Sequence, residues 1–275
     1  MSKTNKIHKV IFAGAGPGDP ELITMKTVRH LREAEVVITD RLVSEEILST
    51  YVNKRALVLH AGKQRQNVES TPQRIINELL VEYALQGRKV VRLKGGDVSI
   101  FSNLLDELQA LNKYEIPYEI VPGITAACGA AASAGIPLTA RNHAQAIRFL
   151  TLHKFSTIST SYWKQLAETD DTLVFYMSGN TTDELVKQLV LHGVDPETYI
   201  AVIEQATTPL QKVFSSRIHI YENLYSQREY VSPTLVIVGK VAALYEELKW
   251  MPEIETTGEL YFKPVSKNKE EEVSA

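Results

Sequence analysis

The chain contains a single cysteine, Cys128, among its 275 residues. One cysteine cannot form a disulfide within the chain, and it excludes a zinc site built from two or four cysteines. The seven histidines are scattered and show neither HExxH nor HxH spacing, so a catalytic metal has no visible set of ligands. We therefore expect chemistry that needs no metal.

Long hydrophobic runs are also missing. No segment approaches the roughly 18 consecutive apolar residues of a membrane-spanning helix, and the apolar run near the N-terminus is too short for a secretory signal. The net charge of −3, without a stripe of aromatic and basic residues, argues against nucleic acid as a partner. We expect a soluble cytoplasmic protein that meets anionic ligands through local clusters of Arg and Lys.

Apolar residues make up 44 % of the chain, and its length suits one large domain or two of moderate size. Apolar runs of strand length alternate with segments whose apolar residues recur at helical spacing, which indicates an α/β fold with mostly parallel or mixed sheets. The strand-length runs are 8–13, 35–40, 56–60, 89–93, 118–121, 146–153, 172–177, 199–205 and 234–239, and the helical segments are 21–33, 71–86, 182–191 and one ending near Trp250.

The residue composition changes after the fifth of these runs, where Pro122 precedes the small-residue stretch TAACGAAASAG. Small residues at helical spacing predict a short, closely packed helix, and a second series of strands and helices follows it. We predict an N-terminal α/β domain over 1–121 and a C-terminal α/β domain over 122–252. The charged segment 253–275 lacks a pattern and is predicted to be disordered.

The first glycine-rich loop, GAGPGDP at 14–20, lies between a predicted strand and a predicted helix, where a dinucleotide-binding fingerprint would lie. Its glycines are evenly spaced, whereas that fingerprint has two residues between its second and third glycines. Pro17 occupies the middle of the loop, and Asp19 adds negative charge where a pyrophosphate would sit. The loop is therefore a poor phosphate site, and a simple tight turn is the alternative.

The second loop is Gly95-Gly96-Asp97, which ends the apolar run VVRLK. Glycines let a backbone approach a ligand closely, and open α/β sheets bind ligands at the carboxyl ends of their strands. A carboxylate accepts hydrogen bonds from hydroxyl or ammonium groups and favours a nearby cation. The loop thus suits a small ligand with hydroxyls and positive charge, although an ordinary turn is an equally good reading of it alone.

Other charged residues allow two readings each. Asp40 and Arg41 end a strand, either as a buried ion pair or as part of a site. Lys63 is either a solvated loop lysine or a site residue. Arg141 and Arg148 belong to a local basic cluster that is either surface chemistry or a carboxylate-binding patch, because arginine binds carboxylates in bidentate fashion.

Taken together, these segments resemble one protein family. In chain order they read AGAGPGDPELIT, TDRLVS, HAGK, RLKGGD, VPGITAA, GIPLTAR, VFYM and SPTLVIVGKV. Each motif alone is weak, but their order and spacing from about Val10 to Trp250 are similar to those of the tetrapyrrole methylases, and within them to the enzymes that C-methylate uroporphyrinogen III.

This resemblance implies two α/β domains with a deep cleft between them, usually in a homodimer. It implies S-adenosylmethionine as methyl donor, S-adenosylhomocysteine as product, and two methylations at C2 and C7 of uroporphyrinogen III that give precorrin-2 for sirohaem or cobalamin synthesis. The cofactor positions of the family fall at Pro17, Gly95, Gly96, Asp97, Ile100, Thr125, Ala126, Met177 and Ala206.

The resemblance also implies a catalytic pair. Asp40 matches the proton acceptor of the family and Lys63 its proton donor, although Lys63 could instead bind a propionate of the substrate. No metal is needed, because the methyl group is already activated on a sulfonium. The substrate is rich in carboxylates, which bind arginine well. The candidate partners are Arg41, Arg65, Arg141 and Arg148.

Some positions depart from the family pattern. The proline expected after Asp97 is Val98, a Gly-Arg-Gly run is replaced by residues 102–104, and Ala206 stands where the family has glycine. These changes leave two alternatives open. One is a sister methylase acting on a later cobalamin precursor, and the other is a non-catalytic module that binds a tetrapyrrole.

Overall fold

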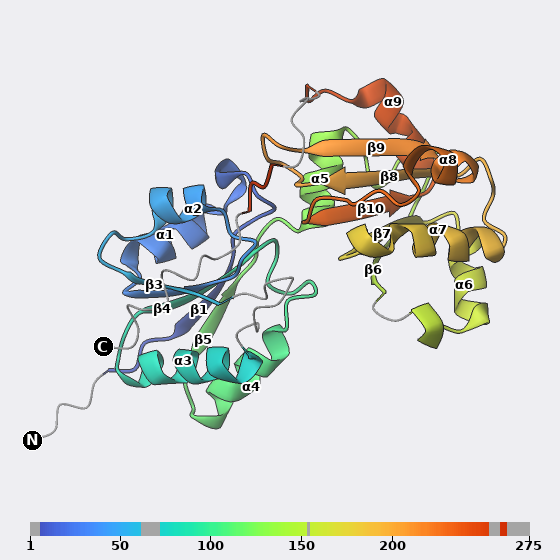
Figure 1. Ribbon diagram of the computed structural model, residues 1–275. Coiled ribbons are helices and arrows are strands. Elements are labelled where there is room, and N and C mark those ends of the chain that lie inside the picture. Colours follow the sequence, from blue (N-terminus) through green and yellow to red (C-terminus); the bar gives the residue numbers. More distant parts are fainter. Residues whose placement is uncertain (1–5, 62–71, 153–154, 253–258, 263–275) are drawn as a thin grey trace, which may run out of the picture. The chain divides into compact units, whose positions relative to one another are not determined.

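A computed structural model describes residues 6–61, 72–152, 155–252 and 259–262. The described chain divides into two units by its internal contacts. The first runs to Thr125 and includes Phe262, and the second runs from Ala126 to Tyr261. Each unit has its own sheet and its own hydrophobic core, which confirms the α/β class expected from the alternating pattern (Figure 1).

The first unit holds a five-stranded sheet in the order β3-β2-β4-β1-β5, and every neighbouring pair is parallel. Helices α1 and α2 cover one face and α3 and α4 the other (Figure 1). The strands are β1 (Val10–Gly14), β2 (Val36–Thr39), β3 (Leu57–His60), β4 (Val90–Lys94) and β5 (Tyr118–Val121), and the helices are η1 (Pro20–Leu22), α1 (Met25–Glu33), α2 (Glu45–Tyr51), α3 (Gln73–Leu85) and α4 (Leu104–Lys113).

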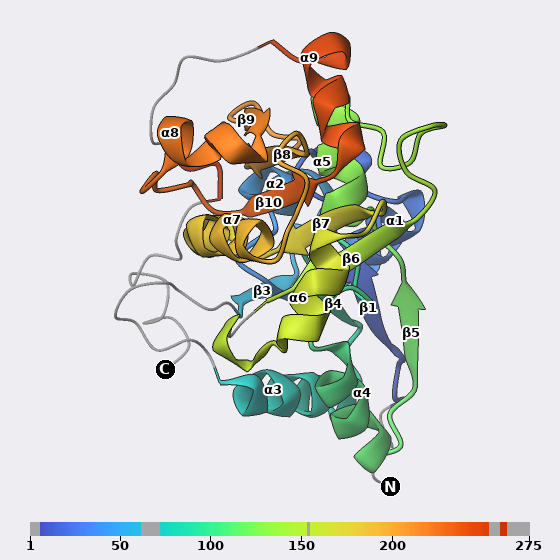
Figure 2. The ribbon, with the colours of Figure 1, turned by 90° about the vertical axis from the view of Figure 1, so that its right-hand side faces the viewer.

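Covering both faces explains why β1 and β2 read as nearly continuous apolar runs. Figure 2 shows α3 and α4 lying side by side under this sheet. The predicted helix over 21–33 is interrupted, because the Thr24 hydroxyl accepts a hydrogen bond from the backbone of Thr27 and starts α1 afresh. The single turn η1 precedes that cap.

The second unit holds a mixed sheet in the order β6-β7-β10-β8-β9. Only β6 and β7 pair in parallel, and the other neighbours are antiparallel. The strands are β6 (Ile147–Thr151), β7 (Thr172–Tyr176), β8 (Tyr199–Glu204), β9 (Lys212–Arg217) and β10 (Thr234–Val238), and the helices are α5 (Ala126–Ala134), η2 (Phe155–Thr157), α6 (Thr160–Ala167), η3 (Gly179–Thr181), α7 (Thr182–Leu191), η4 (Ile218–Ile220), α8 (Tyr221–Tyr225), η5 (Lys240–Leu244) and α9 (Tyr245–Leu248).

Two apolar clusters lie on the two faces of this second sheet. Trp163, Leu185 and Tyr221 bring α6, α7 and α8 onto one face, while the alanines of α5 and the η5 turn pack on the other. Alanine lets a helix backbone approach a sheet closely, which is the packing expected from the small-residue stretch. Strand β9 and helices α2, α4, α6 and α8 were not expected from the sequence pattern.

Most of the segment predicted to be a disordered tail lies outside the described residues. In its described part, the side chain of Gln205 donates to the carbonyl of Glu259 and accepts from the backbone N–H of Tyr261, at 3.1 and 2.7 Å. Within the described ranges, no helix is long and apolar enough to span a bilayer.

Candidate functional site

The carboxyl ends of the strands in the first unit gather most of the residues singled out from the sequence. Because all five strands are parallel, their carboxyl ends lie along one edge of the sheet. Asp40 follows β2, Gly95 follows β4, Gly14 ends β1, and Pro122 follows β5. Three of these strands, β4, β1 and β5, are direct neighbours, so their loops meet.

The two glycine-rich loops bind each other through their backbones. The N–H of Gly96 donates to the carbonyl of Gly16 at 2.7 Å, and the N–H of Gly16 donates to the carbonyl of Gly96 at 3.2 Å. Both glycines have positive φ, 81° at Gly16 and 68° at Gly96, where other residues are strained. The two loops therefore form one structure.

A third loop closes against the other two at Gly123. A Cβ added to Gly123 would lie 2.3 Å from the carbonyl oxygen of Gly96 and 2.8 Å from the Cα of Gly14. A Cβ on Gly14 would meet Gly123 at 2.6 Å. Because these distances leave no room for a side chain, the three loops require glycine where they touch.

Asp97 holds this junction together. One carboxylate oxygen accepts hydrogen bonds from the backbone N–H and the hydroxyl of Ser99, and the other accepts from the backbone N–H of Gly123 at 2.9 Å. A carboxylate has about four lone-pair positions, so Asp97 retains capacity for a ligand group. These bonds tie the loop after β4 to the segment after β5.

The same edge suits a ligand without phosphate. Lys94, next to Gly95, is buried and donates its ammonium to Glu107, so it does not face out of the loop. The neighbouring charge of the loop is the carboxylate of Asp97, which favours hydroxyl and cationic groups. Pro17, Ile100 and Thr125 are each partly exposed beside these loops.

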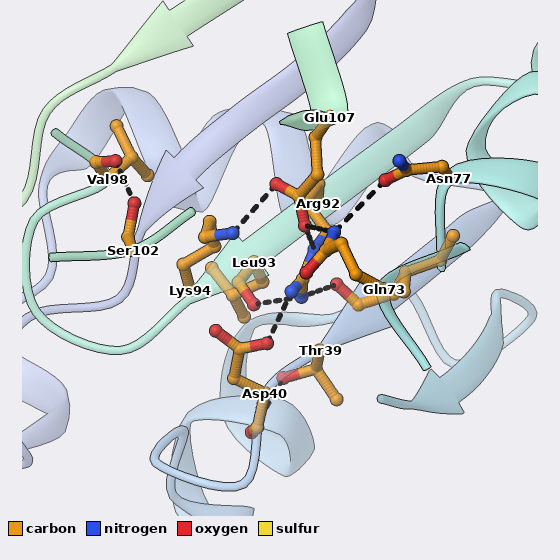
Figure 3. A network of polar contacts seen from close by, with 11 residues as sticks. Thr39, Asp40, Gln73, Asn77, Arg92, Leu93, Lys94, Val98, Ser102 and Glu107 are labelled. Carbon is orange, nitrogen blue, oxygen red and sulfur yellow. Dashed lines mark hydrogen bonds and ion pairs between the residues drawn. The ribbon is translucent and has the colours of Figure 1, made fainter. Parts of the chain in front are cut away.

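Asp40 is held by a buried guanidinium. Nη2 of Arg92 donates to Oδ1 of Asp40 at 2.5 Å, and Nε of the same side chain donates to Oε1 of Glu107 at 2.9 Å (Figure 3). The remaining nitrogen, Nη1, donates to the carbonyls of Ile38 and Leu93 at 3.2 and 3.3 Å. All three nitrogens of Arg92 therefore have partners, which fixes its plane.

Lys94 completes a cluster of two cations and two carboxylates. Its Nζ donates to Oε2 of Glu107 at 2.7 Å (Figure 3). Burial and the adjacent guanidinium of Arg92 lower the pKa of Lys94. Burial opposes the charge of Arg92 as well, but Asp40 and Glu107 together raise the pKa of Arg92 above its ordinary value. The formal charges of the four groups sum to zero.

The interpretation of the sequence missed Arg92, Lys94 and Glu107. Arg92 and Lys94 stand two residues apart in an apolar run, so they point to the same face of a strand that is covered on both sides. Two buried cations on one face require a buried counter-charge. That requirement was the available signal, although it does not say where in the chain the carboxylate lies.

The second unit gathers the remaining positions that the sequence motifs predict for the cofactor at one edge of its sheet. Strands β7 and β8 both run antiparallel to β10, so their carboxyl ends lie at the same edge. Met177 follows β7 with a φ of 57° and 58 % of its surface exposed, and Ala206 follows β8 and is buried. At the start of α5, next to Ala126, the N–H of Ala127 donates to the Tyr176 hydroxyl at 3.1 Å.

The candidate substrate residues are more dispersed. Arg41 lies in the turn directly after Asp40, and Arg141 is exposed in the segment before β6. Arg148 is paired with Asp171 at 2.6 Å, near the start of β6 and β7 and so at the opposite edge from Met177. Lys63 and Arg65 lie outside the described residues.

Among the residues whose positions the structure describes, no group of three or more His, Cys, Asp or Glu side chains is arranged to hold a metal ion.

Known proteins provide the remaining observation. Residues 9–220 match the family model of the tetrapyrrole (corrin/porphyrin) methylases. Siroheme synthase 2 of Aeromonas hydrophila is 45 % identical over 262 residues, which is 95 % of this chain and 55 % of that protein. The chain thus spans about half the length of the curated relatives it matches.

Solved structures match most of the chain. A crystal structure of uroporphyrin-III-C-methyltransferase from Thermus thermophilus is 34 % identical, with a TM-score of 0.74 over 91 % of this chain and 99 % of that one. Another, of the Thermus thermophilus enzyme complexed with S-adenyl homocysteine, is 31 % identical, with a TM-score of 0.71 over 86 % of this chain and 100 % of that one. These matches confirm the resemblance seen in the sequence motifs, and the chain belongs to the tetrapyrrole (corrin/porphyrin) methylases.

Proposed function

We propose that the chain transfers two methyl groups from S-adenosylmethionine to carbons C2 and C7 of uroporphyrinogen III, giving precorrin-2 and S-adenosylhomocysteine. The observation that carries this proposal is the similarity, over 91 % of this chain, to the Thermus thermophilus uroporphyrin-III-C-methyltransferase. The product would feed sirohaem or cobalamin synthesis. The proposal includes a cytoplasmic homodimer, and light scattering of the purified chain tests the dimer.

When bound, S-adenosylmethionine supplies a methyl group already activated on a sulfonium, so the protein has to bind, orient and exclude water. The glycines of the 95–97 loop let hydroxyls of the ligand approach the backbone. Asp97 offers negative charge to an ammonium or sulfonium. Pro17, Ile100, Thr125, Ala126, Met177 and Ala206 supply the surrounding contacts.

Asp40 is the proposed general base. Its side chain is 29 % exposed, so one end of the carboxylate reaches out of the sheet edge while Arg92 holds the other. After the new carbon–carbon bond forms, Asp40 accepts the proton that the tetrapyrrole loses. General-base steps of this kind contribute about 10²–10⁴-fold, and aligning the reacting carbon, methyl and sulfur contributes roughly 7–11 kcal/mol.

The substrate's carboxylates call for arginine. Arg41, next to the proposed base, and the exposed Arg141 are the proposed partners. Arg65 and Lys63, which lie outside the described residues, remain proposed partners on the sequence motifs alone. Lys63 acts as proton donor or as a propionate ligand. Arg148 is omitted, because its guanidinium is committed to Asp171 and lies at the opposite edge of its sheet.

Anaerobic incubation with uroporphyrinogen III and methyl-labelled S-adenosylmethionine tests the proposal. Two labelled methyl groups per tetrapyrrole, at C2 and C7, are the expected result. Labelling of a later precorrin but not of uroporphyrinogen III would indicate the sister methylase instead. Binding of the tetrapyrrole without any transfer of label would indicate a non-catalytic module.

A further inference from the structure

Glu107 is a buried carboxylate to which the proposed reaction gives no role. It lies in the first turns of α4, and its side chain is completely inaccessible to solvent. Its two oxygens bind different cations, Oε1 to Nε of Arg92 at 2.9 Å and Oε2 to Nζ of Lys94 at 2.7 Å (Figure 3). The amide of Gln73 approaches Oε1 at 3.4 Å.

The bond from Glu107 continues through Arg92 to the site. Arg92 uses Nε toward Glu107 and Nη2 toward Asp40, and both donors belong to one planar guanidinium. The orientation of that plane therefore depends on Glu107, and the position of Asp40 depends on the plane.

Exposure falls steadily along this chain of groups. The side chain of Asp40 is 29 % exposed, that of Arg92 3 %, and that of Glu107 0 %. A buried ion cluster is weak evidence for stability, since apolar residues of similar size commonly serve as well or better. Three buried charges that end on one accessible carboxylate are better explained by the placement of that carboxylate.

We propose that Glu107 is a positioning residue of the methyl transfer, which acts through Arg92 to hold the Asp40 carboxylate in the orientation that receives the proton. The role of Lys94 is to balance the second charge, so that Glu107 can be buried beside Arg92. This inference rests on the proposed function, because it assigns Glu107 to the base of that reaction.

Glu107→Gln is the informative change, because it keeps the size of the side chain. A glutamine has one acceptor oxygen and an NH₂ group that cannot accept, so Arg92 and Lys94 lose one of their two acceptors. Arg92 stays protonated in either case. We expect kcat to fall about 10–100-fold, as when other supporting residues of a site are removed, while the Kd for S-adenosylhomocysteine changes less than about threefold.

A double-mutant cycle with Asp40→Asn separates positioning from stability. If Glu107 acts through Asp40, then Glu107→Gln lowers the residual kcat of the Asp40→Asn enzyme by less than about twofold. Leu111→Ala is the matched control, because Leu111 is buried on the same helix and is apolar, so the change disturbs packing without removing a charge. This variant should have a lower Tm, but its kcat should be unchanged at temperatures well below Tm.

The outcomes are distinct. A wild-type chain that transfers no methyl overturns the proposed function and this inference with it. Two results with an active wild type overturn the role of Glu107 alone. One is that Glu107→Gln keeps full kcat. The other is that the kcat losses of Glu107→Gln and Asp40→Asn multiply in full in the double variant. If Glu107→Gln does not fold, Glu107→Gln with Lys94→Met restores charge balance and must show the same loss of kcat and the same non-additivity with Asp40→Asn.

Discussion

The carboxylate of Asp97 accepts a hydrogen bond from the backbone N–H of Gly123 over 2.9 Å, and so joins the loop after β4 to the segment after β5. The same carboxylate binds Ser99 within its own loop. A residue that sequence motifs assign to the ligand thus also fixes the protein around that ligand. Experiments can separate these two roles of Asp97, which are contact with the ligand and ordering of the loop.

Asp97→Ala removes all of these bonds at once. Hydrogen bonds to a charged group contribute about 1.5–3 kcal/mol each, and we expect the Kd for S-adenosylhomocysteine to rise at least about tenfold by isothermal calorimetry. Ser99→Ala is the control, because it removes the hydroxyl but keeps the backbone bond to Asp97, and it should raise Kd less than about threefold. An unchanged Kd in Asp97→Ala would rule out both roles of the carboxylate.

Gly123→Ala tests the contact of the three loops. The new Cβ would lie 2.3 Å from the carbonyl oxygen of Gly96, so the backbone must move. We expect the free energy of unfolding to fall by at least about 2 kcal/mol, the scale of overpacking, and binding of S-adenosylhomocysteine to be lost. Urea unfolding and calorimetry measure the two effects.

The control for this change is Gly193→Ala. Gly193 has a φ of 90° and open space where a Cβ would lie, so alanine there is strained but touches nothing. It should cost about 1–2 kcal/mol of stability and leave ligand affinity unchanged. Equal losses of affinity in both variants would show that strain, rather than loop contact, governs binding.

Met177→Gly should separate stability from affinity in the second unit. Met177 is mostly exposed at a φ of 57°, a backbone conformation that costs a non-glycine residue about 1–3 kcal/mol. Glycine removes this strain but loses more entropy on folding, by about 0.5–1 kcal/mol, so stability should stay level or rise. Affinity for S-adenosylhomocysteine should fall, and a variant that is less stable with normal affinity would contradict the proposed contact.

Glu204 gives the fold a dependence on pH. Burial raises the pKa of this side chain above its ordinary value of 4.5, although the N–H of Val231 donates to it and opposes the shift. The folded state therefore binds the proton more tightly than the unfolded state, and stability falls as pH rises from 4.5 through the folded pKa.

Glu204→Gln keeps an oxygen that can accept from Val231 and has no proton to lose. Urea unfolding of both proteins between pH 4 and 8 should show the variant gaining stability relative to wild type as pH increases. A constant difference across this range would mean that the group does not titrate on unfolding.

Arg141→Ala and Arg148→Ala should differ in kind. Arg141 is exposed, so its loss should raise KM for uroporphyrinogen III about tenfold, as expected for one charge-assisted contact, with kcat retained. Arg148 is paired with Asp171 and Thr169, so its loss should lower Tm and leave KM unchanged. Steady-state kinetics and thermal melts of the two variants decide the assignment. A raised KM in Arg148→Ala would mean that Arg148 binds the substrate after all.

The sequence predicts the positions of β1, β2 and β4 well, because strands covered on both faces are largely apolar, and only Arg92 and Lys94 break the apolar run of β4. It misses β9, whose letters KVFSSR mix polar and apolar residues as an edge strand does. The glycine loops were recognisable because a close backbone approach demands glycine itself. The Asp40–Arg92–Glu107 chain was not, since 52 residues separate Asp40 from Arg92 and only the strand order makes them neighbours.

The glycine contacts among the loops at Gly14, Gly96 and Gly123 have a mechanical consequence. Because backbone packs against backbone with no side chain between them, none of these loops can move without displacing the others. A ligand that displaces one must carry the other two along. We therefore expect hydrogen exchange of the backbone amides in all three loops to slow together when S-adenosylhomocysteine binds, because the loops open as one cooperative unit.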